Sequence, residues 1–146
     1  MSVALGRASL AQARREAQSD PAPGRVHRLP CRVHRTGPAR VAAFFSPAVR
    51  TGDGGELATS FRGRELKGRA VPLPPGYSGV VVREESAGTS LRHEDRRATA
   101  LQAFSAFSAI SHWNLETAPS GDDALPMALA WPALADAIHG SEDEDD

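Results

Sequence analysis

The sequence predicts a small, mainly β domain with a short helix near its C-terminus. Short runs of alternating apolar and polar residues recur from Val26 to Leu115, and clusters of glycine and proline separate them. Only Trp131 to His139 has a clear helical pattern. The 146 residues fit one domain of modest size. Its 13 glycines, 11 prolines and few aromatic residues leave little material for a core, so burial against a partner would help the fold.

Composition divides the chain into three regions. Residues 1–25 are expected to be a disordered extension, because they end in the linker-like Ser19–Gly24 segment. Their arginine-bearing start is also compatible with a mitochondrial transit peptide, and both interpretations stay open. Residues 26–140 form the predicted domain, with a flexible insert at 86–98 that has one large apolar residue. Residues 141–146 are an acidic tail that repels itself and is expected to be disordered.

Two strands are predicted at the start of the domain. Leu29, Cys31 and Val33 alternate with polar residues and with Pro30, the pattern of a half-buried strand at a sheet edge. In this interpretation Cys31 is a small buried hydrophobe. A second apolar run, Arg40–Val49, reads as another strand whose pairing is limited by a proline.

A hairpin is predicted around the stretch "SFRGRELKGR". Leu57, Thr59 and Phe61 share one face of a strand, whereas Leu66 has the opposite parity. The chain must therefore bulge or reverse between them, and Gly63 is the natural position. The cationic residues of this stretch would then lie in water.

Two more strands are predicted toward the C-terminal half. Tyr77–Glu85 contains the run of three valines that centres one of them. In "AFSAFSAIS", Phe104, Phe107 and Ile110 recur every third residue, which would form one stripe on a helix. No cap or helix stop frames this run, so a strand buried on both sides is favoured.

The short helix is predicted from Trp131 to His139. Pro132 suits the first helical position, Leu134 and Ile138 are one turn apart, and Gly140 can end the helix.

No residue pattern indicates catalysis. The five histidines have no metal-ligand spacing, and Cys31 is the only cysteine, so no intrachain disulfide can form and a reducing compartment is favoured. The acidic residues outside the tail are scattered, and no nucleophile or phosphate-loop motif is present. The net charge is −1, and without the five terminal acidic residues it becomes +4, too small a surplus to indicate nucleic-acid binding. No apolar run has the length of a membrane span.

Six blocks in order resemble one known family, the non-catalytic C subunits of the eukaryotic type 2 ribonuclease H complex (ribonuclease H2). The resemblance runs from about Leu29 to His139. The blocks are "LPC", "FFSPAVR", "SFRGRELKG", "VPLPPGYSG", "FSAFSAISHWNLET" and "ALAWPALADAIH". The N-terminal extension does not clearly match, the charged insert is short for the family, and basic character after Asp122 is weak.

The resemblance implies a fold and a role. In this family, the C subunit intertwines with the B subunit in a triple-barrel β assembly, which would make this chain a small β-barrel domain. The pair docks on the catalytic A subunit, which carries the carboxylates and the divalent metal ions, such as magnesium. The resulting heterotrimer degrades the RNA of RNA–DNA hybrids and removes ribonucleotides misincorporated in DNA, mainly in the nucleus. This chain would be a scaffold without catalytic, cofactor-binding or metal-binding residues.

Nine residues are expected to take part in partner binding: Arg62, Arg64, Lys67, Arg69, Val80, Val82, Phe104, Phe107 and Trp113. The four cationic residues could instead be solvated or lie near the backbone of the hybrid, although direct contact with nucleic acid is the less favoured interpretation. The alternative function is an independent small β-barrel that binds single-stranded nucleic acid through the basic hairpin, with Phe61 or Tyr77 as stacking surfaces.

Overall fold

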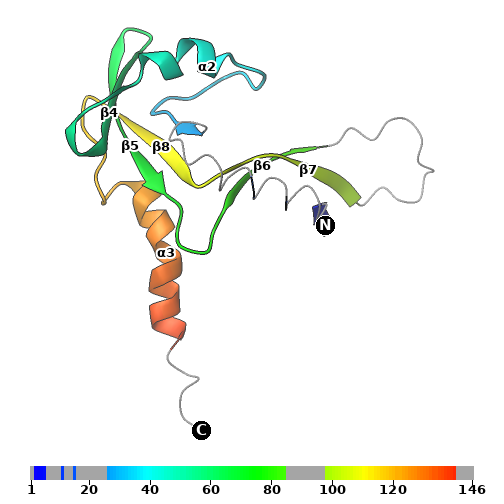
Figure 1. Ribbon diagram of the computed structural model, residues 1–146. Coiled ribbons are helices and arrows are strands. Elements are labelled where there is room, and N and C mark those ends of the chain that lie inside the picture. The colour runs from blue at the N-terminus through cyan, green and yellow to red at the C-terminus, as the bar shows by residue number, and fades with distance from the viewer. Residues whose placement is uncertain (1, 6–10, 12–14, 16–25, 85–97, 141–146) are drawn as a thin grey trace, which may run out of the picture. The chain divides into compact units, whose positions relative to one another are not determined.

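The computed structural model describes residues 2–5, 11, 15, 26–84 and 98–140 (Figure 1). Two compact units form, each from two separate stretches of the chain. The first comprises Met1–Ala22 with Tyr77–Ser108, and the second comprises Pro23–Gly76 with Ala109–Asp146. Most of the predicted extension and insert, and all of the acidic tail, lie outside the described residues. The predicted domain boundaries therefore stay predictions.

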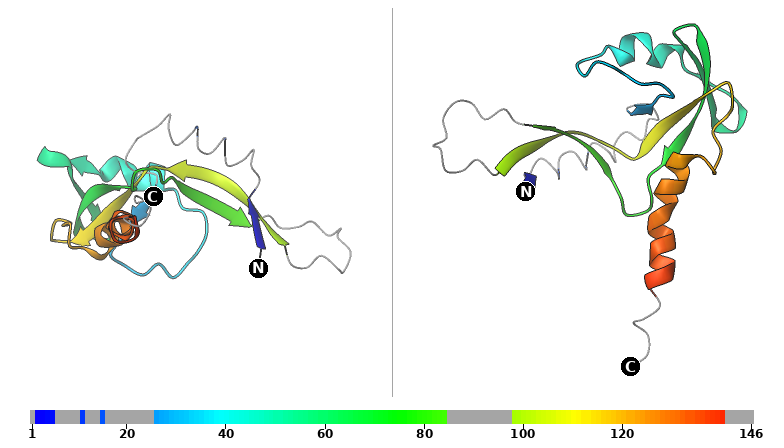
Figure 2. Two further views of the ribbon diagram at one scale, coloured as in Figure 1. Left: turned by 90° about the horizontal axis from the view of Figure 1, so that it is seen from below. Right: turned by 180° about the vertical axis from the view of Figure 1, so that it is seen from behind.

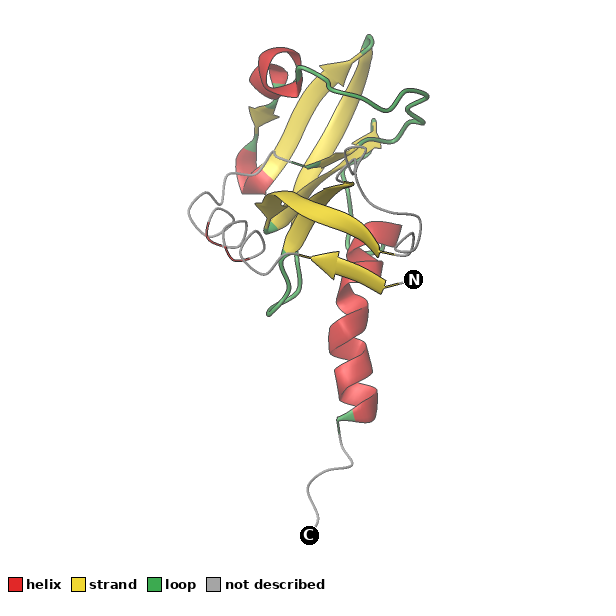
Figure 3. Ribbon diagram, turned by 90° about the vertical axis from the view of Figure 1, so that its right-hand side faces the viewer, coloured by secondary structure: helices red, strands yellow, loops and turns green. Residues whose placement is uncertain are grey.

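A five-stranded sheet organises the second unit. Its strands lie in the order β2 (His27–Arg28), β8 (Ala109–Leu115), β5 (Arg64–Pro72), β4 (Glu56–Phe61) and β3 (Arg50–Thr51). β2 pairs with β8 in parallel, and the other neighbours are antiparallel (Figure 3). Because β2 and β3 are free edges, the described part of this sheet is open. The predicted mainly β class is confirmed, but this sheet is not closed into a barrel within the described residues, and the predicted intertwining with a B subunit stays a prediction.

The predicted hairpin around Gly63 is confirmed. Phe61 pairs directly with Arg64, so only two residues connect β4 to β5. Both adopt left-handed backbone angles, with φ of 51° at Arg62 and 75° at Gly63. Two such residues fit the tight turn whose twist matches that of the flanking strands. The reversal places Leu57 and Leu66 on the same buried face, which explains their opposite parity in sequence.

The strand predicted through Leu29, Cys31 and Val33 is wrong beyond its start. β2 ends at Arg28, and residues 31–40 are exposed and outside any strand or helix. Pro30 has no backbone N–H to donate to β8, which explains why pairing stops there. Cys31 is consequently exposed and is not the buried hydrophobe that its alternation suggested.

The strand predicted over Arg40–Val49 is also wrong. One helical turn, α2 (Val41–Phe44), and the 3-10 helix η1 (Ser46–Ala48) occupy this stretch. Pro47 lies in the first turn of η1, where its fixed φ suits a helix and its missing N–H costs nothing. The two turns direct Phe45 toward the sheet, while Phe44 stays in solvent under the guanidinium of Arg40.

The core of the second unit is small and aromatic. Leu57, Leu66 and Trp113 are buried, and half-buried side chains pack around them: Leu29, Phe45, Val49 and Phe61. The Phe45 ring lies edge-on to Trp113, with 5.7 Å between centroids, a favourable arrangement for two aromatic rings. Nε1 of Trp113 donates a hydrogen bond to Nδ1 of His27 at 3.2 Å. β2 is therefore fastened to the core by its histidine.

The first unit is a three-stranded sheet in the order β1 (Ser2–Leu5), β7 (Ala98–Phe107) and β6 (Gly79–Glu84). β1 is parallel to β7, in a stretch where the sequence pattern predicted no strand. β6 and β7 form an antiparallel pair with a register shift between Val81 and Val82. The predicted strand character of Tyr77–Glu85 and of the "AFSAFSAIS" run is thus confirmed, since β7 and β8 cover the latter except for one residue.

The helix α3 (Ala124–His139) begins seven residues earlier than predicted. Pro132 lies inside it rather than at its start, and Pro126 occupies the first turn, where a missing N–H is tolerated. Gly140 ends the helix as predicted, and its N–H donates to the carbonyl of Asp136 at 2.7 Å. In the described part of the chain, no helix has both the length and the apolar character needed to cross a membrane.

Candidate partner-binding surfaces

An unpartnered apolar stripe runs along α3. Met127, Trp131, Leu134 and Ile138 are spaced by four, three and four residues, so they lie on one face of the helix. Each is at least half exposed, with values of 59%, 62%, 50% and 58%. No residue of α3 is buried, and the helix leads away from the five-stranded sheet of its unit (Figures 1 and 2). Apolar surface of this extent on a regular element is typical of a protein interaction site.

Asp123 anchors the start of this helix to the sheet. Its Oδ2 accepts hydrogen bonds from Nδ2 of Asn114 at 2.8 Å, from the backbone N–H of Ser120 at 3.1 Å and from Nε2 of His112 at 3.2 Å. These hydrogen bonds, led by that of Asn114, hold the pKa of Asp123 below its ordinary value. The carboxylate therefore fixes the point at which α3 leaves β8.

His112 has a second side-chain partner on β2, in addition to Asp123. Its Nδ1 lies 3.2 Å from Nη1 of Arg28, and a guanidinium can only donate. Nδ1 must accept, so the proton resides on Nε2, which donates to Asp123. This imidazole, which is only 1% exposed, thus connects β2, β8 and the first residue before α3.

A groove with a basic rim opens beside the β4–β5 hairpin. It encloses about 530 Å³ and lies between segment 30–35 and the hairpin end of the sheet. Apolar side chains line part of it: Pro30, Val33, Phe61, Leu66 and Leu115. Four arginines, a histidine and a cysteine line the rest: Arg32, Arg35, Arg62, Arg64, His34 and Cys31. No aspartate or glutamate is among its lining residues.

The residues predicted to bind partners are dispersed. Arg62 and Arg64 line the groove, whereas Lys67 and Arg69 belong to the opposite face of β5, beside Asn114 and His112. Val80 and Val82 lie on β6 of the first unit, and Val82 is 41% exposed. Phe107 is half-buried on β7, while the side chain of Phe104 lies outside the described set.

Trp113 is 1% exposed in the core of its own sheet, so it contributes to folding and is not part of the surfaces defined here. Sequence reasoning missed the segment 30–35 and the stripe on α3. Apart from the end of the "LPC" block, the segment carries no motif, and its role depends on the hairpin beside it. The stripe was detectable, because the spacing of its four residues is visible in the sequence. The misplaced helix start hid Met127.

No catalytic constellation lies on these surfaces. Among the described residues, no group of three or more His, Cys, Asp or Glu side chains is placed to hold a metal ion. His112 and Asp123 are occupied in structural hydrogen bonds rather than presented to a substrate. What the described chain offers is an open sheet, an exposed apolar helix and a basic groove, the properties of an accessory protein that assembles with other chains.

The comparisons with known proteins give this class a family. A family model described as the ribonuclease H2 non-catalytic subunit (Ylr154p-like) matches residues 25–138. The C subunit of ribonuclease H2 from Bos taurus is 42% identical over 144 residues, covering 86% of this chain and 87% of the bovine protein. The corresponding C subunit from Mus musculus is 40% identical over 143 residues, covering 85% and 86%. An uncharacterised protein of Schizosaccharomyces pombe is 38% identical over 56 residues, about 37% of this chain and 38% of that protein. The chain belongs to the family of non-catalytic subunits of ribonuclease H2, as its six sequence blocks indicated.

Proposed function

We propose that this chain is the non-catalytic scaffold of a heterotrimeric type 2 ribonuclease H, in which it joins the B subunit and the catalytic A subunit. The catalytic partner supplies the carboxylates and the divalent metal ions, and the complex acts in the nucleus. Its substrates are the RNA strand of RNA–DNA hybrids and single ribonucleotides embedded in DNA. Family membership supports this assignment, and the exposed stripe of α3 is the observation that carries it.

The physical reason is that the described chain leaves too much apolar surface in water. The buried apolar core of the five-stranded sheet consists of three residues, whereas α3 exposes four large apolar side chains. Burying such side chains against another protein stabilises an assembly by roughly 25 cal/mol per Å² of apolar surface removed from water. A partner that adds strands to the free edges β2 and β3 would complete the sheet, and we propose that the B subunit does so in an intertwined triple barrel.

A pull-down with a matched pair of variants tests this function. The tagged chain is co-expressed with the two other subunits, and the stoichiometry and the magnesium-dependent cleavage of an RNA–DNA hybrid are measured. Wild type is expected to recover both partners and the activity, whereas the chain alone shows no cleavage. Trp131→Glu is expected to weaken assembly by about thirtyfold or more, as for a central aromatic contact. Ala133→Glu places the same charge on the other side of α3 and should leave assembly intact.

Two results would contradict the proposal. A wild-type chain that recovers neither partner, or that cleaves the hybrid without them, is not the scaffold. Equal recovery of partners by both variants would remove α3 as the docking element.

A further inference from the structure

We infer that the groove beside the β4–β5 hairpin binds an extended segment of a partner protein in the complex, one that carries acidic residues next to large aliphatic side chains. The inference rests on the proposed function, because it assigns a specific site to one of the partner contacts. The groove differs from the stripe of α3 in both its location and its chemistry, so a separate contact is required to fill it.

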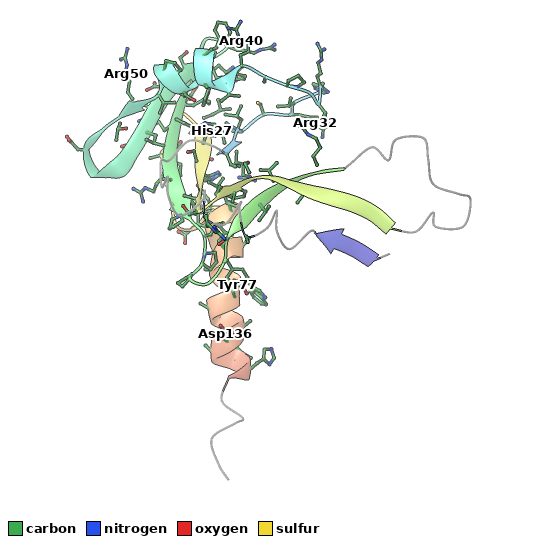
Figure 4. All side chains as sticks on the ribbon, turned by 45° about the vertical axis from the view of Figure 1, so that its right-hand side comes forward. His27, Arg32, Arg40, Arg50, Tyr77 and Asp136 are labelled. Atoms are coloured by element: carbon green, nitrogen blue, oxygen red, sulfur yellow. The ribbon has the colours of Figure 1, made fainter. Side chains whose placement is uncertain are left out.

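The charge of the rim selects for an acidic occupant. Arg32 and Arg35 come from segment 30–35, and Arg62 and Arg64 come from the hairpin (Figure 4 shows Arg32 on its segment). None of the four makes an ion pair or a side-chain hydrogen bond with any other described residue. Their charges are thus uncompensated within the described chain. Guanidinium groups pair with carboxylates through two parallel hydrogen bonds, so an acidic segment is the complementary ligand.

The apolar lining selects for a peptide rather than a nucleic acid. Val33 and Leu115 line the groove and are 68% and 39% exposed. Aliphatic side chains of a bound peptide would cover both of them. A phosphate backbone would satisfy the arginines but would leave these residues in water. Stacking of bases needs open aromatic faces. Phe61, the only Phe, Tyr or Trp in the lining, is half-buried and lies edge-on to Phe45 at 6.1 Å.

The dimensions of the groove also fit a short segment. A volume of about 530 Å³ lies within the range of roughly 300–1,000 Å³ typical of ligand pockets. One wall is formed by six consecutive residues, 30–35, so the groove follows a stretch of backbone. A few residues of an extended partner segment, with aliphatic side chains directed inward and carboxylates toward the rim, would fill it.

Cys31 provides a direct probe of this groove. It is the only cysteine of the sequence, it is exposed, and it lines the groove. A maleimide-benzophenone label on Cys31 of the full chain can be photo-crosslinked after assembly with the partner proteins, and mass spectrometry then identifies the captured peptide. In parallel, the alkylation rate of the unlabelled thiol is compared between the native assembly and the urea-unfolded chain. The matched control carries Cys31→Ser with Asp53→Cys, which moves the thiol to an exposed turn outside the groove.

The expected result is capture of a partner segment that contains both acidic and aliphatic residues. Cys31 should be alkylated at least about tenfold more slowly in the assembly than in the unfolded chain, while the control thiol is not protected. Arg32→Glu with Arg64→Glu should reduce the crosslink yield about tenfold, because like charges then face each other. Arg40→Glu with Arg50→Glu makes the same change in net charge at two exposed positions outside the groove lining and should leave the yield unchanged. If Arg32→Glu with Arg64→Glu unfolds the chain, Arg32→Gln with Arg64→Gln is used in its place, and a smaller reduction of the crosslink yield is expected.

Several results would overturn the inference. In the crosslinking experiment, these are capture of nucleic acid, of the chain's own Glu142–Asp146, or of a partner segment without acidic residues. In the alkylation experiment, it is a Cys31 thiol that reacts as fast in the assembly as in the unfolded chain. If the crosslinking or alkylation results contradict peptide binding in the groove, but the chain still recovers both partners, the proposed function stands. If no partners are recovered, the proposed function fails. The free chain is then titrated with a fluorescein-labelled peptide of alternating glutamate and leucine, and absence of saturable binding overturns the groove as well.

Discussion

Replacing Gly68 by alanine is expected to destabilise the five-stranded sheet, although alanine is the better residue for a strand. A Cβ atom at Gly68 would lie 2.5, 2.8 and 2.8 Å from three carbons of the Trp113 ring. Carbon atoms in good contact are separated by about 3.5–4.0 Å. The ring would therefore have to move by about 1 Å, yet it is buried, hydrogen-bonded to His27 and packed edge-on against Phe45.

Two opposing effects determine how much Gly68→Ala changes the free energy of unfolding. Overpacking in a well-filled core costs about 1–3 kcal/mol, and the upper half applies because Trp113 is only 1% exposed and is held by His27 and Phe45. The lower backbone entropy of alanine in the unfolded chain offsets about 0.5–1 kcal/mol. The net loss of stability is therefore about 1–2.5 kcal/mol, or a fall of roughly 3–10 °C in melting temperature for a chain of this size.

Thermal unfolding of the purified assembly, at equal concentrations of each variant, measures this difference. Gly121→Ala serves as the control, because a Cβ there has no neighbour within 4 Å and no unfavourable backbone angle. Its melting temperature is expected to stay within about 2 °C of wild type. If the melting temperature of Gly68→Ala is equal to or higher than that of wild type, the packing argument is refuted. The better suitability of alanine for a strand would then be the dominant effect.

Three further changes test other parts of the structure. Thr59→Val should raise stability by about 1 kcal/mol in urea titrations, because the buried Oγ1 of Thr59 has no hydrogen-bond partner among the described residues; a loss of stability would reveal a hidden partner. Asp123→Asn should lower the melting temperature at about pH 6, and the difference should vanish in acid. The pKa of Asp123 is lowered from 3.8, so the carboxylate stabilises the fold above that value and loses its effect as pH falls through the folded pKa; a difference that persists at about pH 2 would contradict this origin. Gly79→Ala should destabilise the first unit, because a Cβ there would overlap the ring of Phe107; unchanged hydrogen exchange in β6 and β7 would argue against it.

Local chemistry made parts of the fold predictable from the sequence. The turn at Gly63 was found because the faces of Leu57 and Leu66 disagree unless the chain reverses between them. The strand character of "AFSAFSAIS" followed from the absence of any helix cap. In both places the sequence itself carries the constraint that the structure obeys.

The incorrect predictions concern segments whose structure depends on contacts with residues far away in the sequence. Leu29, Cys31 and Val33 alternate as a strand would, but the segment has only β8 to pair with, and Pro30 ends that pairing. The run around Phe45 forms helical turns, which place the Phe45 ring edge-on to Trp113, a residue remote in sequence. The local sequence does not contain this contact. Residues of the groove come from segments whose proximity depends on the whole sheet, so no local pattern could have identified them.

The route of the backbone has a consequence for biosynthesis. Each compact unit is assembled from two stretches, and the bond between Arg28 and His112 joins positions 84 residues apart. Leu57 and Leu66 therefore remain uncovered on the nascent polypeptide until the ribosome has translated Trp113. Contacts this remote form slowly, and exposed apolar strands invite aggregation in the meantime. Neither unit can be cut out as one continuous fragment, because the two stretches of each unit are separated by a stretch of the other.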